Sequence, residues 1–100
     1  MSYMNVDRIS FTEEEREKKI LAFIKDGVLR ELPSKEKRKV IILLELIKKF
    51  SKETVYSEKE VNEIIKAYYH DFAILRRYLI DHKLLERSTD CKKYWVNHLL

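Results

Sequence analysis

The chain has 100 residues, of which 45% are hydrophobic and 38% are charged, and its formal net charge is +4. A chain of this length forms one domain with one modest core, and it contains no run of about 20 apolar residues that would span a membrane. The first eight residues lack the apolar segment of a secretory signal peptide, and Cys91 is the only cysteine. We therefore expect a cytoplasmic protein without an intrachain disulfide.

The first predicted helix begins at a capping box, Thr12 to Glu15, and extends over residues 12–25. Asp26-Gly27 ends it, because glycine takes a positive φ at little cost. Residues 1–11 are expected to be a flexible N-terminus, and residues 12–100 a single domain.

The second predicted helix covers residues 35–50. Residues 28–32 form a short extended connector that ends at Pro33, and Ser34 is the expected N-cap. The run from Val40 to Leu44 is apolar all round, which is typical of a helix covered on more than one side. We predict that this helix is central and packs under the first.

Two further helices follow. Residues 54–56 are β-prone, and the capping box Ser57 to Glu60 opens a helix over residues 58–68. Asp71 is the expected cap of the next helix, residues 71–83.

The C-terminal part is predicted to be a β-hairpin. Residues 84–87 and 94–96 have strand character, and the polar stretch 88–93 joins them. The whole order of elements predicts an α+β, mostly α, fold: a winged helix-turn-helix with an extra N-terminal helix and a C-terminal β-hairpin wing. Residues 71–83 then take the position of the recognition helix.

The predicted recognition helix has two distinct faces. Its outward face is centred on Arg77, and Arg76 lies near the edge of the core face. The inward face, at helical spacing, contains Phe72, Leu75, Tyr78, Leu79 and His82. Arg77 and Arg76 are candidates for contact with guanine or phosphate, and Ala73 and Ile80 for contact with thymine methyl groups. The alternative for Arg77 is a surface ion pair with Asp81, and for Arg76 a stem along the core edge.

Positive charge is concentrated in two other places. Residues 34–52 carry seven basic and two acidic side chains, a net charge of +5. Clustered positive charge suits a phosphate-facing surface, although a solvated helix has the same composition. The candidate phosphate contacts are Lys35, Lys37, Arg38 and Lys39 at the start of the second helix and Arg87, Lys92 and Lys93 around the wing.

Several motifs together resemble a bacterial family, the domain of unknown function 2087. The matching stretches are Phe23-x-x-Asp26-Gly27-x-Leu29, Leu32-Pro33 before the Lys/Arg run, Tyr56 to Ile64, Asp71-x-x-x-Leu75-Arg76-Arg77-x-Leu79, Leu85-x-Arg87 and Tyr94-Trp95. The resemblance covers about three quarters of the chain and implies a winged-helix domain with a role in transcription, because some members are joined to DNA-binding regulator domains. Members commonly have glycine in the wing turn, where this chain has Cys91. If that position has a positive φ, Cys91 costs about 1 kcal/mol there.

No catalytic or metal-binding constellation stands out. His70, His82, His98 and Cys91 lack zinc-ligand spacing, and no phosphate-binding glycine loop or nucleophile elbow occurs. We therefore expect no enzyme activity, no metal and no cofactor, and we expect Cys91 to be dispensable, with a redox sensor as the alternative.

The predicted function is DNA binding in transcriptional control, with double-stranded DNA as partner and a homodimer or a regulator protein as a further partner. The alternative is a protein-interaction or dimerisation module with the same fold that does not read DNA. Two features favour that alternative: an outer helix face made partly apolar by Ala73 and Ile80, and the acidic residues Glu58, Glu60 and Glu63 in the preceding helix.

Overall fold

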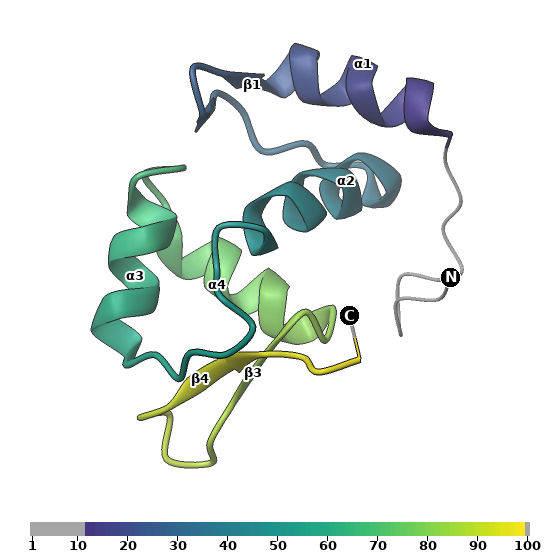
Figure 1. Ribbon diagram of the computed structural model, residues 1–100. Helices are drawn as coiled ribbons and strands as arrows, with labels where there is room; N and C mark the ends of the chain where they lie inside the picture. The colour runs from purple at the N-terminus through teal and green to yellow at the C-terminus, as the bar shows by residue number, and fades with distance from the viewer. Residues whose placement is uncertain (1–11, 100) are drawn as a thin grey trace.

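The computed structural model describes residues 12–99, so the prediction for residues 1–11 lies outside the described residues. This part of the chain forms four helices and two β-hairpins, and Figure 1 shows how they are arranged. In chain order the elements are α1 (Glu13–Phe23), β1 (Ile24–Lys25), β2 (Val28–Leu29), α2 (Glu36–Ile47), α3 (Glu58–Lys66), α4 (Phe72–Asp81), β3 (Leu85–Arg87) and β4 (Tyr94–Val96). The fold is a small, mostly helical α+β arrangement, as predicted.

Three of the predicted helix caps are confirmed. The hydroxyls of Thr12 and Ser57 each accept a hydrogen bond from the backbone N–H three residues later, at 3.0 and 3.1 Å. The glutamate at each of those positions accepts a bond back from the cap N–H, which completes both capping boxes. Asp71 accepts from the N–H of Ile74 at 3.4 Å and begins α4.

The predicted end of the first helix is wrong. The helix stops at Phe23, and β1 and β2 form an antiparallel hairpin in which Ile24 pairs with Leu29. Asp26 and Gly27 have φ angles of 54° and 76°, as a two-residue Asp-Gly hairpin turn requires. Asp26 and Gly27 therefore form the turn between two strands and do not cap a helix. The second strand is joined to the rest of the domain by a hydrogen bond from the Leu29 N–H to the carbonyl of Tyr68, at 2.8 Å.

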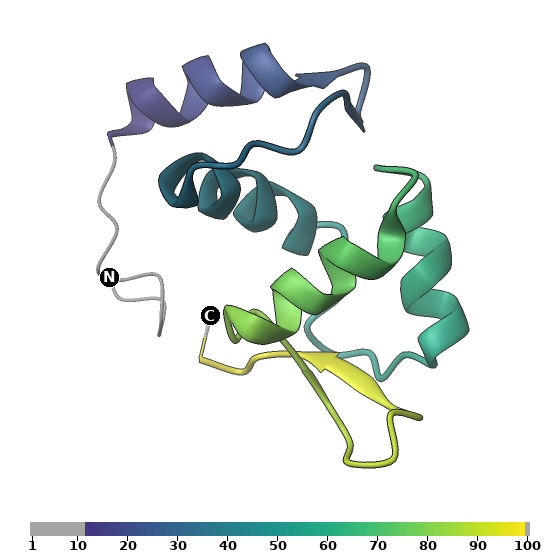
Figure 2. The same ribbon diagram turned by 180° about the vertical axis from the view of Figure 1, so that it is seen from behind.

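Helix α2 is central, as predicted, but Ser34 is not its cap. The N-cap is Lys35, without a side-chain hydrogen bond, because the helix begins one residue later than the pattern indicated. The side chains from Val40 to Leu43 are all buried. In Figures 1 and 2 α2 runs between α1 on one side and α4 with the C-terminal hairpin on the other, which explains why it is apolar all round.

The inward face of α4 packs on the main core. Leu75 and Leu79 are fully buried, and Phe72 and Tyr78 are partly buried against the same cluster. The cluster joins α4 to residues of the other elements, among them Leu29, Leu43, Leu46, Val61, Ile65, Tyr68, Leu84, Leu85, Tyr94 and Val96. The predicted orientation of α4 is confirmed, so its opposite face is turned away from the core.

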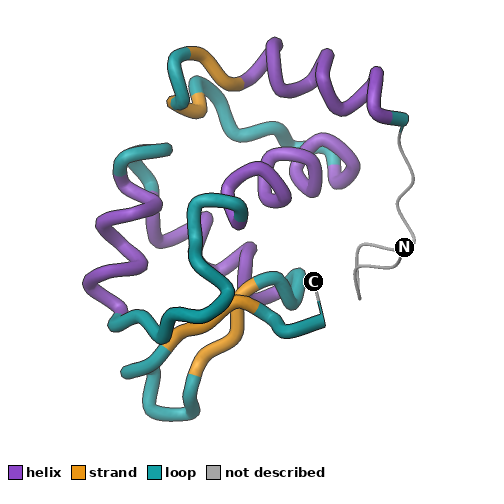
Figure 3. The backbone as a smooth tube through the Cα atoms, in the orientation of Figure 1, coloured by secondary structure: helices purple, strands orange, loops and turns teal. Residues whose placement is uncertain are grey.

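The predicted C-terminal hairpin is confirmed. Strands β3 and β4 are antiparallel, with Leu85 opposite Val96 and Arg87 opposite Tyr94. Tyr56 forms an isolated bridge to Tyr94, with N···O distances of 2.7 and 2.8 Å, and so adds a third extended segment beside β4. Figure 3 shows that this hairpin and the β1–β2 hairpin lie at opposite ends of the molecule.

Candidate nucleic-acid interface

An open groove lies between the outer face of α4 and the β3–β4 hairpin. Its volume is about 440 Å³. It is lined by Glu58, Ala73, Arg76, Arg77, Ile80, Asp81, Arg87, Cys91 and Tyr94. We call it the α4–hairpin groove. Three arginines and two carboxylates line it, so its wall carries a small positive excess.

Arg77 is a strongly exposed arginine of the groove. Its side chain is 80% exposed, and its Nε lies 3.8 Å from a carboxylate oxygen of Asp81, one turn later in α4. An exposed pair at this spacing contributes only about 0.3–0.5 kcal/mol. The guanidinium is therefore available to a ligand at little cost.

Arg76 is held inside the domain. It donates a short hydrogen bond to the side-chain oxygen of Asn62 in α3 and lies 3.9 Å from a carboxylate oxygen of Glu58. Its side chain is 23% exposed. This arrangement ties α4 to α3, and it fits the edge position predicted for Arg76 better than the outward face.

Arg87 is fixed by the hairpin turn, residues 88–93. Its Nη1 donates to the carbonyl of Ser88 and to Sγ of Cys91, both at 3.1 Å. The carboxylate of Asp90 accepts from the Ser88 hydroxyl at 2.6 Å and from the Lys92 N–H at 3.0 Å. The Ser88 hydroxyl and then the Lys92 N–H lower the pKa of Asp90, and the same bonds shape the turn.

Cys91 occupies the position for which the resemblance implied glycine. Its φ is 61°, in the left-handed region, so the condition for a cost of about 1 kcal/mol is met. Its N–H donates to the carbonyl of Ser88 at 3.0 Å. Lys92 and Lys93 in the same turn are exposed.

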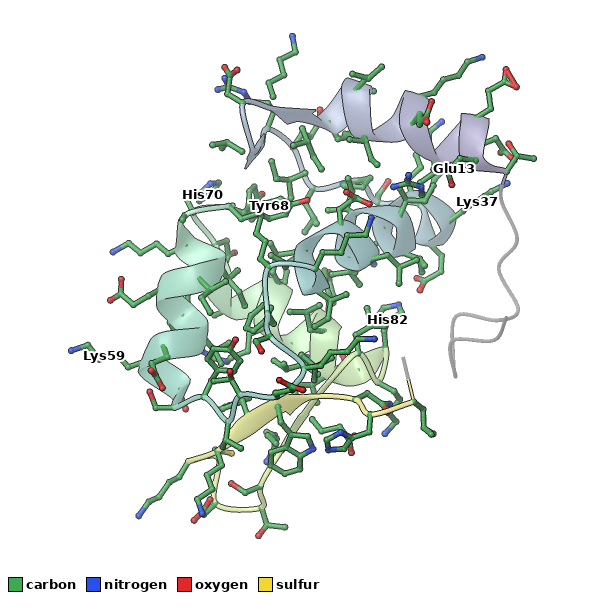
Figure 4. All side chains as sticks on the ribbon, viewed as in Figure 1. Glu13, Lys37, Lys59, Tyr68, His70 and His82 are labelled. Carbon is green, nitrogen blue, oxygen red and sulfur yellow. The ribbon has the colours of Figure 1, made fainter. Side chains whose placement is uncertain are left out.

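The cations at the start of α2 are placed apart from this groove, because none of them lines it. Lys37 pairs with Glu15 of α1 at 2.8 Å, and Figure 4 shows it beside the first turn of α1. Lys39 lies 4.4 Å from the ring centre of Tyr78. Lys35 is exposed and Arg38 is partly buried. Two of these four cations therefore have partners within the domain.

The structure thus brings together five of the predicted site residues, Ala73, Arg76, Arg77, Ile80 and Arg87. Sequence reasoning missed Asn62 as the partner of Arg76, and the predicted site residues did not include Tyr94. Tyr94 is 3% exposed, yet it borders the groove, where its hydroxyl lies 3.5 Å from Glu58. Burial, and after it the Glu58 carboxylate, raise the pKa of Tyr94. No local pattern connects these residues, because each contact joins elements distant in the chain.

The described fold is that of a small α+β domain. The comparison with protein families assigns the chain to one particular family. The chain belongs to the family described as "Uncharacterized protein conserved in bacteria (DUF2087)", which matches residues 28–96. The match extends from β2 to β4 and so contains the whole α4–hairpin groove, whereas α1 precedes it. No curated protein and no solved structure matches the chain.

Residues 12–99 contain neither a metal-binding cluster nor a membrane-spanning helix. No group of three or more histidine, cysteine, aspartate or glutamate side chains in this range is arranged to hold a metal ion. None of the helices in the same range has the length and apolar character that a membrane crossing requires.

Proposed function

We propose that this chain is a winged helix-turn-helix domain that binds double-stranded DNA through α4 and acts in transcriptional control. The order of elements supports the fold assignment: α2, an extended segment at Tyr56, α3, a short turn, α4 and then the β3–β4 hairpin. In such domains the second helix of the pair enters the major groove. Helix α4 takes that position, and the hairpin takes the position of the wing.

The observation that carries the proposal is the exposure of Arg77 on the outer face of α4. Its side chain is 80% exposed beside the α4–hairpin groove. A guanidinium there suits either the O6/N7 edge of guanine or a phosphate, because its donors form a planar fork. Ala73 and Ile80 flank Arg77 in the same groove and provide apolar contacts for thymine methyl groups.

Two of the three acidic residues named in α3, Glu58 and Glu60, oppose phosphate binding less than the sequence suggests. Glu58 faces Arg76 at 3.9 Å and lies within reach of the Tyr94 hydroxyl. Glu60 uses its carboxylate in the capping box with Ser57, at 2.8 Å. Lys92 and Lys93 in the hairpin turn are exposed and are assigned to the DNA backbone.

The test is a fluorescence anisotropy titration with mixed-sequence DNA duplexes at low and at physiological salt. Arg77→Ala removes no core contact, so it changes the free energy of unfolding by less than about 0.5 kcal/mol. If Arg77 reads a base, the variant loses about 1–3 kcal/mol on the best site and relaxes its preference at one position. If Arg77 contacts phosphate, affinity falls evenly across sequences and the salt slope shrinks by about one.

Lys25→Ala is the matched control, since it removes one exposed positive charge from β1 at the opposite end of the molecule. It leaves the affinity within a factor of about two. A wild-type affinity no tighter than about 100 μM at low salt contradicts the proposal, because non-specific binding alone reaches that range.

The second candidate is a protein-interaction or dimerisation module. The partly apolar outer face of α4 favours it, because Ala73 is exposed and Ile80 is only partly buried. In that case Ile80→Asp abolishes self-association or partner binding in sedimentation experiments. Any weak DNA affinity then stays unchanged.

A further inference from the structure

We propose that the α4–hairpin groove contains a binding site for one phosphoryl group, held by the free edge of the Arg87 guanidinium. If the phosphoryl group is part of DNA, this proposal depends on the proposed DNA-binding function. A free phosphate or phosphate monoester has the same chemistry, and the experiment below separates the two sources.

The first step is the way in which Arg87 is anchored. Both of its hydrogen bonds to residues 12–99 leave from Nη1, to the carbonyl of Ser88 and to Sγ of Cys91. A guanidinium has five N–H donors in one plane, and Nε with Nη2 forms a parallel pair on another edge. No side chain or carbonyl within residues 12–99 accepts a hydrogen bond from that pair. Such an edge fits two oxygens of one phosphate, with two charge-assisted hydrogen bonds.

The second step is the charge balance of the groove. Its two carboxylates each face another arginine: Glu58 lies 3.9 Å from Arg76, and Asp81 lies 3.8 Å from Arg77. Arg87 has no carboxylate within 4.0 Å in the part of the chain that the structure describes. The positive excess of the groove is therefore concentrated on Arg87, where an anion binds without displacing an acidic side chain.

The third step is preorganisation by the hairpin turn. Ser88 donates its N–H to the carbonyl of Lys93 at 2.9 Å, and Cys91 donates its N–H to the carbonyl of Ser88 at 3.0 Å. These bonds fix both acceptors of Arg87 before a ligand arrives, so less side-chain entropy is lost on binding. They also give the thiol of Cys91 a positioning role, because a glycine at this positive φ would offer Arg87 no acceptor.

The groove is larger than one phosphate. Its volume of about 440 Å³ is in the range of small-molecule sites, roughly 300–1,000 Å³. It therefore has room for the sugar or base that follows the phosphoryl group. Arg77 on the opposite wall adds a second exposed guanidinium to the same space.

The experiment uses the full chain labelled with ¹⁵N and follows the Arg87 Nε–Hε signal and the backbone amides of β3 and β4. The probes are inorganic phosphate, adenosine monophosphate and a mixed-sequence DNA duplex, each titrated separately. Two variants are compared with the wild type. Arg87→Lys keeps the charge and loses the planar fork, whereas Lys25→Ala loses one exposed charge of β1 and keeps the fork.

We expect a shift of the Arg87 Nε–Hε signal, a roughly five- to ten-fold weaker affinity for Arg87→Lys, and less than a two-fold change for Lys25→Ala. Thermal unfolding of each variant confirms that it is folded. If the duplex produces this result and the free phosphates do not, the site takes a DNA phosphate. If the free phosphates produce it and the duplex does not bind, the site stands and the proposed DNA function fails.

The opposite results overturn the proposal. If the duplex binds and Arg87→Lys binds as tightly as the wild type, the phosphoryl site is wrong while DNA binding stands. If Lys25→Ala weakens binding as much as Arg87→Lys, charge alone matters and the fork has no role. If none of the three probes shifts the Arg87 signal, the phosphoryl site is wrong. If the anisotropy titration also shows no binding of the duplex, the proposed DNA function fails as well.

Discussion

The β1–β2 and β3–β4 hairpins both turn through residues with positive φ, at Asp26 and Gly27 in the first and at Cys91 in the second. The first has a two-residue turn, and its strands contribute one buried side chain, Leu29. The second has a longer turn, and its strands bury Leu85, Tyr94 and Val96. The groove lies beside the second hairpin only.

This difference separates two causes of hairpin structure. A short Asp-Gly turn closes by its own backbone preference and needs little help from the core. The longer turn with cysteine at a positive φ is held by the buried strands on either side and by side-chain bonds within the turn. The hairpin with the less favourable turn residue is thus the one that is better anchored. It carries Arg87 at the end of β3 and Lys92 and Lys93 in its turn.

The largest expected effect tests how strongly buried side chains anchor each hairpin to the core. Leu85→Ala removes a fully buried side chain from β3 and should lower the free energy of unfolding by about 2–5 kcal/mol, because it leaves a cavity in the core. Val28→Ala removes a side chain that is 39% exposed from β2 and should cost less than about 1 kcal/mol. Urea denaturation of both variants measures the contrast. Equal losses would show that the two hairpins are anchored alike.

The next effect tests the turns. Gly27→Ala should destabilise the protein by about 1 kcal/mol through the positive φ alone, because the space around a Cβ there is open. Cys91→Gly should stabilise it by up to about 1 kcal/mol, since the strain is relieved. The measurement is the unfolding midpoint in urea.

Cys91→Ser is the control for these turn variants. The serine hydroxyl also accepts a hydrogen bond, so it can replace the thiol as the acceptor for Arg87. Stability and any binding should therefore be unchanged under reducing and oxidising conditions. Loss of binding on mild oxidation of the wild type, absent in Cys91→Ser, would instead make the turn a redox switch.

The smallest expected change in stability concerns the C-terminal end of α4, which directly precedes the β3–β4 hairpin. Nε2 of His82 lies 2.5 Å from a carboxylate oxygen of Glu36, and Figure 4 shows His82 below the first turns of α2. This hydrogen bond lowers the pKa of Glu36. A lowered folded-state pKa means that the stabilisation is present above the unfolded value, about 4.3, and is lost as the pH falls through the folded value.

Stability of the wild type should therefore exceed that of Glu36→Gln near pH 6, and the difference should shrink as the solution is acidified below about pH 4. Because Glu36 is more than half exposed, the difference is expected to be small. Urea denaturation across this range measures it, with Glu14→Gln in α1 as the control. A difference that grows on acidification would show that the ion pair does not stabilise the fold.

Local chemistry allowed the sequence by itself to determine most elements of this fold. The caps at Thr12, Ser57 and Asp71 each depend on residues within three positions of one another, so the starts of three helices were predictable. The periodicity of α4 was sufficient to assign Leu75 and Leu79 to the core. The strands at 85–87 and 94–96 were predictable because alternating apolar residues flank a polar stretch.

Tertiary structure decided the rest, because those features depend on contacts across the chain. The Asp26-Gly27 pair is compatible with a helix end and with a hairpin turn. It forms a hairpin turn here because Ile24 pairs with Leu29. The partner of Arg76 is Asn62, fourteen residues earlier in another helix, and no spacing rule connects the two. The groove exists only because α4 and the β3–β4 hairpin pack on the same core and leave Arg77 and Arg87 on facing walls.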